Sequence, residues 1–452
     1  MRLRSLSPRP RRLQITFYAE WTLGEDREET QMHVVTEWDR ASGSLFARNS
    51  YHPDHGSRVA FAALSPRATG FTADRAEFLG RNRAAHAPAA LGRTGLTQRS
   101  GTGLDPCAAL QTTVVLAPGA MVEVTALLGQ AGDAQEARQL VRRYSDSVVV
   151  EEALDRTRER WDALLGTIQV RTPMLSTDFL LNRWLLYQTL SCRVWGRSGF
   201  YQSSGAFGFR DQLQDAMALV STAPALTRQL ILNAAAHQFV EGDVQHWWHE
   251  PGGAGIRSRC SDDLLWLPFV AAHYVRATGD EDILEEPVPF IQARLLEDGE
   301  PEAYSRPHTA DESASLLEHC RRAVERGLTA GPHGLPLMGS GDWNDGLNRV
   351  GIGGKGESVW LGWFLVRVLK DFAELCERRG RKDEGGKRGS VRTGLCKPLS
   401  RAGGTGDCIC APSLTTALRW AVRAAPRRGS TRCRNPGQSC RARESPVALA
   451  RL

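Results

Sequence analysis

The spacing of apolar residues changes once along this chain, near Asp133, and this change limits the folds open to it. From Leu13 to about Gly129, β-branched and aromatic residues alternate with polar ones in short runs separated by Gly, Pro, Asp and Ser. Such alternation is typical of strands with one buried face. Residues 13–132 therefore predict an antiparallel β-sandwich.

After the change the spacing is helical. Residues 133–171 are richly charged and predict a solvated helical linker. Over residues 172–379, apolar residues recur in successive helical blocks with broad apolar faces, which indicates helices that pack on one another. The expected fold is thus multidomain β + α, a sandwich followed by a linker and an α/α toroid. The clearest helical blocks are Thr177–Val194, Gln212–Val220, Ala225–Phe239, Ser261–Ala277, Glu312–Gly327 and Glu357–Arg378.

Both ends of the chain are basic. Residues 1–12 form a basic segment without the apolar stretch of a signal peptide. Residues 381–452 carry 16 Lys+Arg against 4 Asp+Glu, a net of +12, so the rest of the chain has a net charge of −6. Residues 380–452 predict a low-order tail, either disordered or the product of a shifted reading frame. The alternative is a basic interaction tail, and the acidic body gives no reason to expect nucleic acid.

The cysteines of the body are scattered, which suggests a reducing compartment and a cytoplasmic protein. No apolar run approaches the ~20 residues of a membrane span, so membrane insertion is not expected. Cys408 and Cys410 resemble half of a zinc site. Because no histidine follows His333 and no second pair stands at ligand spacing, no metal site is predicted.

A polar loop, Gly339–Asn348, has the composition of a sugar-binding acid/base site. Trp343 offers a flat apolar face to a pyranose ring. Asp342 and Asp345 supply two carboxylates, one to bind hydroxyls and one to give up a proton.

Three further polar clusters stand at the ends of predicted helices. Arg210 and Asp211 follow a loop of small residues, although an ordinary ion pair at a helix start explains them equally well. Asp262 and Asp263 have a rival interpretation as partners of a helix dipole with Ser261 as N-cap. Because alternate loops of a toroid converge on one rim, the clusters together favour an enzyme.

The third cluster contains two tandem tryptophans, Trp247 and Trp248, which suit sugar stacking. His246, His249 and Glu250 beside them are rival candidates for a metal site, in a loop bounded by Gly and Pro.

Five ordered motifs, GFRDQLQD, VQHWWHE, SDDLLWLP, GSGDWNDGLN and GKGESVW, follow a β-rich region containing ARNSYHPDHGSRVAF. Together they resemble the inverting phosphorylases of glycoside hydrolase family 94, above all the phosphorylase-like portion of cyclic β-1,2-glucan synthases and 1,2-β-oligoglucan phosphorylase. The resemblance covers about residues 13–379. It implies a supersandwich-like β-sandwich, a helical linker and an (α/α)6 barrel.

The resemblance also implies roles for single residues. Asp345 is the expected general acid, and inorganic phosphate, a co-substrate rather than a cofactor, attacks the anomeric carbon from the opposite face. A carboxylic acid that donates a proton near neutral pH needs burial or a neighbouring anion, and Asp342 or phosphate is the expected anion. Asp345 should then lie near the Arg210–Asp211 pair. The expected substrate-binding residues are Arg210, Asp211, Asp342, Trp343, Trp247, Trp248 and Asp263.

The chain departs from the family pattern in two places. Residues 202–205 replace a phosphate-binding arginine of the family, so Arg193 or Arg197 is expected to bind phosphate instead. The family's barrel also continues where this chain turns into its basic tail. We therefore expect a truncated barrel with exposed apolar helix faces and impaired activity.

The expected partners are a β-glucan oligosaccharide and phosphate, with a homodimer as one assembly open to the chain. The expected reaction transfers a glucosyl unit from β-1,2-glucan to phosphate and gives α-glucose 1-phosphate. Two rival functions remain. One is a carbohydrate-binding fragment without catalysis. The other is a hydrolase of the same fold that uses Asp263 or Glu357 as a second carboxylate.

Overall fold

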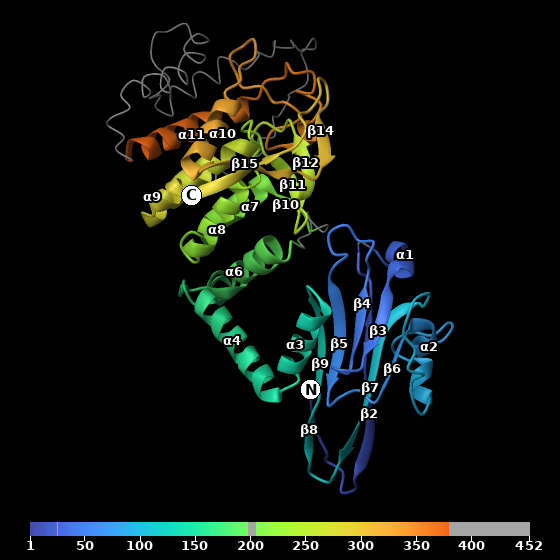
Figure 1. The fold of residues 1–452 in the computed structure, drawn as a ribbon. Helices are drawn as coiled ribbons and strands as arrows, with labels where there is room; N and C mark the ends of the chain where they lie inside the picture. The colour runs from blue at the N-terminus through green and yellow to red at the C-terminus, as the bar shows by residue number, and fades with distance from the viewer. Residues whose placement is uncertain (25, 198–204, 379–452) are drawn as a thin grey trace, which may run out of the picture. The chain divides into compact units, whose positions relative to one another are not determined.

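The computed structural model describes residues 1–24, 26–197 and 205–378, which form two compact units divided after Leu190 (Figure 1). The predicted tail, residues 380–452, and residues 202–204 of the expected phosphate loop lie outside the described residues. Among the described residues, no helix is both long and apolar enough to span a membrane.

The first unit contains an antiparallel β-sandwich, as the alternating pattern predicted. One sheet has the order β2-β7-β6, the other the order β3-β4-β5-β9, and β1 pairs with β8. The strands are β1 (Arg2–Arg4), β2 (Arg11–Glu20), β3 (Val35–Asp39), β4 (Ser44–Arg48), β5 (Val59–Ser65), β6 (Gly70–Asp74), β7 (Pro106–Leu116), β8 (Met121–Glu123) and β9 (Thr125–Ala131). Short helices α1 (Arg27–Thr30), η1 (Gln31–His33), α2 (Arg75–Leu79) and η2 (Ala89–Gly92) fill the connections.

The two sheets share one apolar core, to which Leu45 and Phe71 contribute from opposite sheets. Helix α3 (Ala134–Tyr144) covers the outer face of the second sheet, where its Val141 and the sheet's Phe61 belong to one apolar cluster. Strand β5 is therefore buried on both faces, which explains why its sequence is a continuous apolar run rather than an alternating one.

The change of period at Asp133 marks a helix start. The Asp133 side chain accepts a hydrogen bond from the Glu136 amide at 2.8 Å, and the Glu136 carboxylate accepts one from the Gly132 amide at 2.7 Å. This reciprocal arrangement satisfies one free amide in the first turn of α3 and the amide just before its N-cap. The helical elements that follow are α4 (Ser147–Leu165), α5 (Leu175–Phe179), the π-helical η3 (Leu180–Trp184), α6 (Leu185–Gln188) and the π-helical η4 (Thr189–Trp195).

The second unit is a helical array around one large apolar core. Its helices are α7 (Phe209–Leu219), α8 (Pro224–Ala235), η5 (Asp263–Leu265), α9 (Trp266–Thr278), η6 (Asp282–Glu285), α10 (Leu316–Gly327), η7 (Asp345–Leu347) and α11 (Val359–Arg378). The predicted helical blocks are present, but several bounds differ, since α8 ends at Ala235 and α9 begins at Trp266 after η5. Residues 312–315 extend a strand, so α10 begins at Leu316.

The sequence pattern did not predict the strands of this unit. Strands β10 (Phe207–Gly208), β11 (Gln245–His249), β12 (Ala254–Ser258) and β14 (Glu302–Ser305) form an antiparallel sheet in that order, and β13 (Pro287–Gln292) pairs with β15 (His308–Ser315). The tandem tryptophans therefore lie on a strand, which corrects the expected loop.

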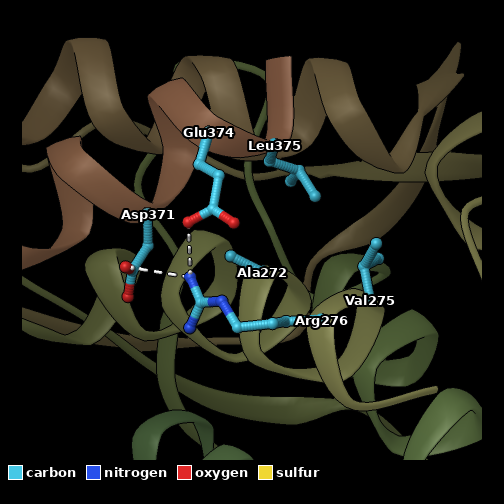
Figure 2. A pocket seen from close by; sticks show the side chains of 6 residues that line it. All are labelled: Ala272, Val275, Arg276, Asp371, Glu374 and Leu375. Carbon is cyan, nitrogen blue, oxygen red and sulfur yellow. Dashed lines mark hydrogen bonds and ion pairs between the residues drawn. The ribbon is translucent and has the colours of Figure 1, made fainter. Parts of the chain in front are cut away.

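A small pocket between α9 and α11 holds an ion pair rather than an open cavity (Figure 2). Arg276 donates to Asp371 at 3.0 Å and to Glu374 at 3.3 Å. These contacts join the two helices beside their shared core, so we assign the pocket a structural role.

Candidate active site

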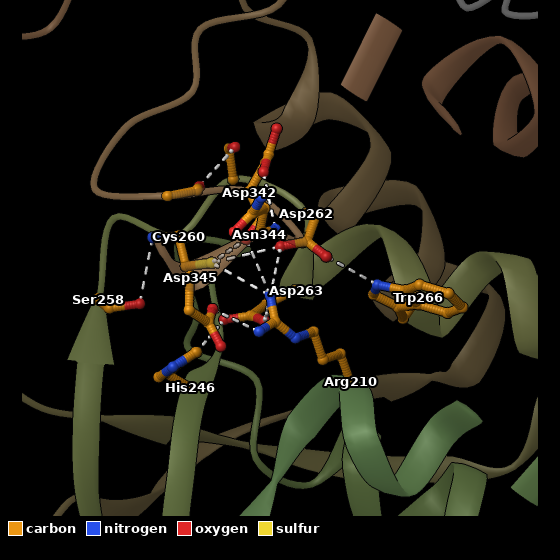
Figure 3. Close-up of polar contacts among 12 residues, drawn as sticks. Arg210, His246, Ser258, Cys260, Asp262, Asp263, Trp266, Asp342, Asn344 and Asp345 are labelled. Carbon is orange, nitrogen blue, oxygen red and sulfur yellow. Dashed lines mark hydrogen bonds and ion pairs between the residues drawn. The ribbon is translucent and has the colours of Figure 1, made fainter. Parts of the chain in front are cut away.

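Arg210 is the centre of a polar cluster that gathers residues from four of the motifs (Figure 3). It lies in the first turn of α7, directly after β10, and is buried. Its Nη1 donates to the Asp262 carboxylate at 3.1 Å and to the Asp342 carbonyl at 3.0 Å, while Nη2 donates to the Asp345 carboxylate at 2.5 Å. The proximity of Asp345 to Arg210 that the sequence led us to expect is present.

The loop that carries Asp345 is held against the segment before η5. The Ser340 amide donates to the Arg259 carbonyl at 3.1 Å, and the Ser261 amide donates to the Gly341 carbonyl at 2.9 Å. These paired backbones bring the Asp342 carbonyl to Arg210, so the loop and the start of α7 form one site.

The Asp342 side chain stabilises the Gly339–Asn348 loop by hydrogen bonds. Its carboxylate is buried and accepts hydrogen bonds from the Ser358 hydroxyl at 2.6 Å and the Asn344 amide at 2.9 Å. Both oxygens therefore have protein partners, which corrects the expectation that this side chain contacts substrate directly.

Asp345 and Trp343 face outward from the same loop. The Asp345 side chain is 71% exposed and pairs with the Arg210 guanidinium. This corrects the expectation that burial keeps this carboxyl protonated and leaves the anion of bound phosphate as the remaining candidate for that effect. The Trp343 indole is half exposed, and its ring centre lies 6.4 Å from that of Trp360. An accessible carboxyl beside an accessible indole suits a bound sugar ring, which stacks on aromatic faces and receives protons at its oxygens.

Asp262 and Asp263 are buried next to Arg210, at the start of η5, which leads directly into α9. The N-cap is therefore Asp262 rather than the expected Ser261, while both aspartates stand at a helix start as that interpretation held and also face Arg210. Asp262 also accepts hydrogen bonds from the Trp266 indole at 3.0 Å and the Cys260 thiol at 3.3 Å. Burial and the neighbouring Asp263 raise the pKa of Asp262 to about 6, against the opposing effect of Arg210.

The two tandem tryptophans have different environments. Trp247 is partly exposed and lies near Tyr304, with ring centres 6.1 Å apart. Trp248 is fully buried and stacks on His237, with ring centres 3.7 Å apart. A sugar cannot reach Trp248, so its expected role in substrate stacking is corrected to a role in the core.

The rival metal set of His246, His249 and Glu250 is not brought together in the described structure. His249 packs against the edge of Trp247, and Glu250 accepts a hydrogen bond from the Trp248 indole at 3.1 Å. His246 instead contacts the Asp263 carboxylate through Nδ1 at 2.6 Å.

A different set of ligand types does converge, since atoms of His246, Cys260 and Asp263 lie within 4.8 Å of one another. However, the Arg210 guanidinium lies 4.0 Å from an Asp263 oxygen. That fixed positive charge disfavours a divalent cation there.

The two arginines expected to bind phosphate form a second cluster around Asp215. Arg193 lies 3.1 Å from the Asp215 carboxylate and 3.6 Å from that of Asp211, and Arg197 lies 3.6 Å from Asp215. Arg197 is buried, and its Nε also donates to the Ala206 carbonyl at 3.0 Å. Burial raises the pKa of Asp215 against the effect of the two arginines.

Sequence reasoning named Asp211 but missed Asp215, one helical turn further along α7. The spacing of four residues was an available signal, because residues at i and i+4 share a helix face. It also missed Ser358 and Cys260, which contact Asp342 and Asp262. No local signal marked Ser358, because its partner lies in another segment, whereas Cys260 stands only two residues before Asp262.

Comparison with known proteins identifies the domains. Residues 1–147 match the supersandwich domain of glycosyl hydrolase 94, and residues 160–408 match the catalytic domain of the glycosyl hydrolase 94 superfamily. A cyclic beta-(1,2)-glucan synthase, NdvB of Rhizobium meliloti, is 45% identical over 385 residues, covering 84% of this chain and 14% of that protein.

Two phosphorylases are also similar. Solabiose phosphorylase of Paenibacillus borealis is 31% identical over 384 residues, covering 84% of this chain and 46% of that enzyme. The 1,2-beta-oligoglucan phosphorylase of Listeria innocua is 31% identical over 185 residues, covering 39% of this chain and 16% of that enzyme. The chain thus spans less than half the length of these relatives. Since both of its domains match family models, the chain belongs to glycosyl hydrolase family 94.

Proposed function

We propose that this chain carries the donor-sugar site of an inverting phosphorylase that acts on β-1,2-glucan. The contact between Arg210 and Asp345 is the observation that carries the proposal. It joins two motifs 135 residues apart in the chain at one accessible carboxyl group. The cyclic beta-(1,2)-glucan synthase and the 1,2-beta-oligoglucan phosphorylase among the relatives support the β-1,2 linkage.

In the proposed reaction, Asp345 gives a proton to the glycosidic oxygen as the bond from that oxygen to the anomeric carbon breaks. A phosphate oxygen forms the new bond to the anomeric carbon from the opposite face, so the product is α-glucose 1-phosphate. A single carboxylic acid suffices, because phosphate is already an anionic nucleophile. Arg210, Asp211 and Trp343 are the residues proposed to hold the glucosyl unit.

Arg193 and Arg197 are the proposed phosphate ligands. Asp215 pairs with both in the described structure. Of the two, Arg193 is the more accessible, with a side chain 29% exposed. Phosphate binding then requires Arg193 to exchange part of its contact with Asp215 for the incoming anion.

Hydrolysis in the same fold is the second candidate, but its proposed carboxylates are already engaged. Asp263 is buried against His246, and Glu357 contacts His333 through both of its oxygens, at 2.8 and 2.9 Å. An inverting hydrolase needs a carboxylate that faces a water molecule across the sugar ring. This observation favours phosphorolysis.

The test is to incubate the full chain with β-1,2-glucooligosaccharide, with and without inorganic phosphate. The proposal expects α-glucose 1-phosphate that appears only with phosphate. Free glucose in both reactions would show a hydrolase. Calorimetric binding without any product would leave a carbohydrate-binding fragment, and grafting the C-terminal half of a full-length phosphorylase onto the chain would then show whether the missing activity resides in that half.

A further inference from the structure

His246 occupies an irregular position on β11 that no assigned role explains. Gln245 pairs with Arg257 and Trp247 pairs with Ile256, so His246 has no partner across the strand pair. One extra residue of this kind is a β-bulge, which interrupts the alternation of side chains and turns the bulged one in a new direction. The bulge therefore sets the direction of the His246 side chain.

The bulge brings His246 to a buried carboxylate. Its Nδ1 lies 2.6 Å from an Asp263 oxygen, while the Asp263 side chain is only 2% exposed and that of His246 is 25% exposed. A buried negative charge at this distance favours the imidazolium form. The charge of Asp263 is the largest cause that raises the pKa of His246 to about 9, against the opposing effect of burial.

The orientation of the ring leaves one donor available. Nδ1–H donates to Asp263, so an imidazolium still carries Nε2–H. Within the part of the chain that the structure describes, no protein atom accepts a hydrogen bond from Nε2. A charged donor held at the edge of a polar cluster without an acceptor is suited to a ligand oxygen.

The surroundings of His246 link this donor to the candidate site (Figure 3). Asp345 acts on the imidazole as a nearby negative charge and Arg210 as a nearby positive one. Cys260, whose Sγ lies within 4.8 Å, has a thiol whose pKa is raised well above its usual value by burial, so it stays neutral. The donor thus lies beside the carboxyl proposed to protonate the glycosidic bond.

We propose that His246 is a further substrate-binding residue, which donates a hydrogen bond from Nε2 to a hydroxyl of the glucosyl unit beside Asp345. Asp263 is its positioning residue. This inference rests on the proposed function for the identity of the sugar. Asp263 was expected to contact the substrate directly. In this proposal it acts on the substrate only through His246.

The proposal has a consequence for pH. When His246 loses its proton, the remaining proton stays on Nδ1 facing Asp263, and Nε2 becomes an acceptor. Oligosaccharide affinity should therefore stay constant in the neutral range and fall as pH rises through about 9. Without the Asp263 charge, the same fall should occur near the ordinary value of 6.5.

The test compares the full-length wild type with Asp263→Asn and His246→Gln. Calorimetry gives the affinity for β-1,2-glucooligosaccharide from pH 5.5 to 10, and NMR of ¹⁵N-labelled histidine follows the imidazole directly. Asp263→Asn should match the wild type at the lowest pH and bind about tenfold more weakly at pH 8. At pH 7, His246→Gln should bind the oligosaccharide about tenfold more weakly than the wild type, since a hydrogen bond to a charged group is worth about that factor. Its affinity should not depend on pH between pH 6 and 9.

His308→Gln is the matched control, because His308 is an exposed histidine on a strand of the same unit. It should leave both the affinity and its pH dependence unchanged. The proposal is overturned if Asp263→Asn keeps the wild-type pH profile, if His246→Gln binds as tightly as the wild type, or if the wild type binds no β-1,2-glucooligosaccharide. Binding that behaves as expected without phosphorolysis would instead refute the proposed function and leave this inference standing.

Discussion

At the scale of single residues, one buried arginine organises the candidate site. Arg210 is surrounded by the carboxylates of Asp262, Asp263 and Asp345, and these charges raise its pKa against the effect of burial. A guanidinium with several fixed partners keeps one orientation. The site is thus preorganised on its protein side, while Asp345 keeps most of its surface available to a ligand.

The first prediction concerns Asp345. Asp345→Asn removes the only dissociable proton of that side chain but keeps its size, so turnover should fall by about 10²–10⁴-fold, the usual contribution of a general acid. Oligosaccharide affinity should stay within about tenfold of the wild type. Release of α-glucose 1-phosphate and calorimetry measure the two quantities. Asp298→Asn, at an exposed loop position, is the control, and unchanged turnover in Asp345→Asn would refute the acid assignment.

Residue identities were easier to predict than residue environments. The sequence indicated that Arg210, Asp263 and Asp345 belong to one site, but the local pattern around Asp262 and Asp263 indicated only the helix start and not the contact with Arg210. The deciding partner, Arg210, lies 52 residues earlier than Asp262, so no window around Asp262 contains it. Trp248 was mistaken for a sugar-binding residue for a related reason. Neighbours on one strand face opposite sides, and the sequence pattern did not reveal the strand.

At the scale of elements, the loop from Gly339 to Asp345 depends on a backbone conformation that favours glycine. Gly339 has φ of +64°, and a Cβ there would lie 2.0 Å from the Arg259 carbonyl oxygen. Gly341 differs, since a Cβ there would meet no atom within 4 Å. The chain therefore offers a matched pair of positions on one loop.

The second prediction uses this pair. Gly339→Ala should displace the loop and lower kcat/KM by about 100-fold, because misplacing a catalytic group by about 1 Å costs a factor of that size. Gly341→Ala should stay within about threefold of the wild type. Hydrogen exchange of the loop amides provides a readout that does not depend on activity. Equal exchange and equal kinetics in the two variants would contradict the role of Gly339.

The third prediction concerns the packing of α10 on the β13–β15 pair. His319 is fully buried, stacks on Phe290 and contacts the Val288 carbonyl through Nε2 at 3.0 Å. Burial lowers the pKa of His319 from 6.5 to about 4. The unfolded chain therefore binds the proton more readily between these values, so the free energy of unfolding should fall by about 3 kcal/mol as pH drops from 6.5 to 4.

His319→Gln keeps a donor for the Val288 carbonyl but removes the titrating group. Between pH 7.5 and pH 4.5, the free energy of unfolding of the variant should fall by about 2–3 kcal/mol less than that of the wild type. Urea unfolding followed by tryptophan fluorescence at both pH values measures the difference. His86→Gln, in an exposed loop of the sandwich, should behave as the wild type. If the free energy of unfolding falls equally in the wild type, His319→Gln and His86→Gln, groups other than His319 cause the acid sensitivity.

The strands of the second unit show where sequence patterns stop being informative. Strand β15 is mostly polar and exposed, and its last residues were predicted to begin a helix. Its pairing with β13 outweighs that local preference, since strand propensity depends strongly on tertiary context. In contrast, the helices from α7 to α11 were predicted well, because each buries a broad apolar face in one shared core.

At the scale of the whole molecule, the apolar side chains of residues 174–185 stand out. Phe179 is 70% exposed and Trp184 is 53% exposed, and Met174, Leu175, Leu181 and Leu185 are exposed as well. A contiguous apolar surface in water favours association with a complementary apolar surface.

The last prediction follows from this apolar segment. The full chain should bind the dye ANS and self-associate as its concentration rises, because association removes apolar surface from water. The double variant Phe179→Ser and Trp184→Ser should lower both ANS fluorescence and the mass-average size measured by light scattering. Met32→Ser with Tyr51→Ser is the matched control, since both residues are exposed and lie outside residues 174–185. If the control lowers the two signals equally, or if the wild type binds no dye, residues 174–185 do not form an associating surface.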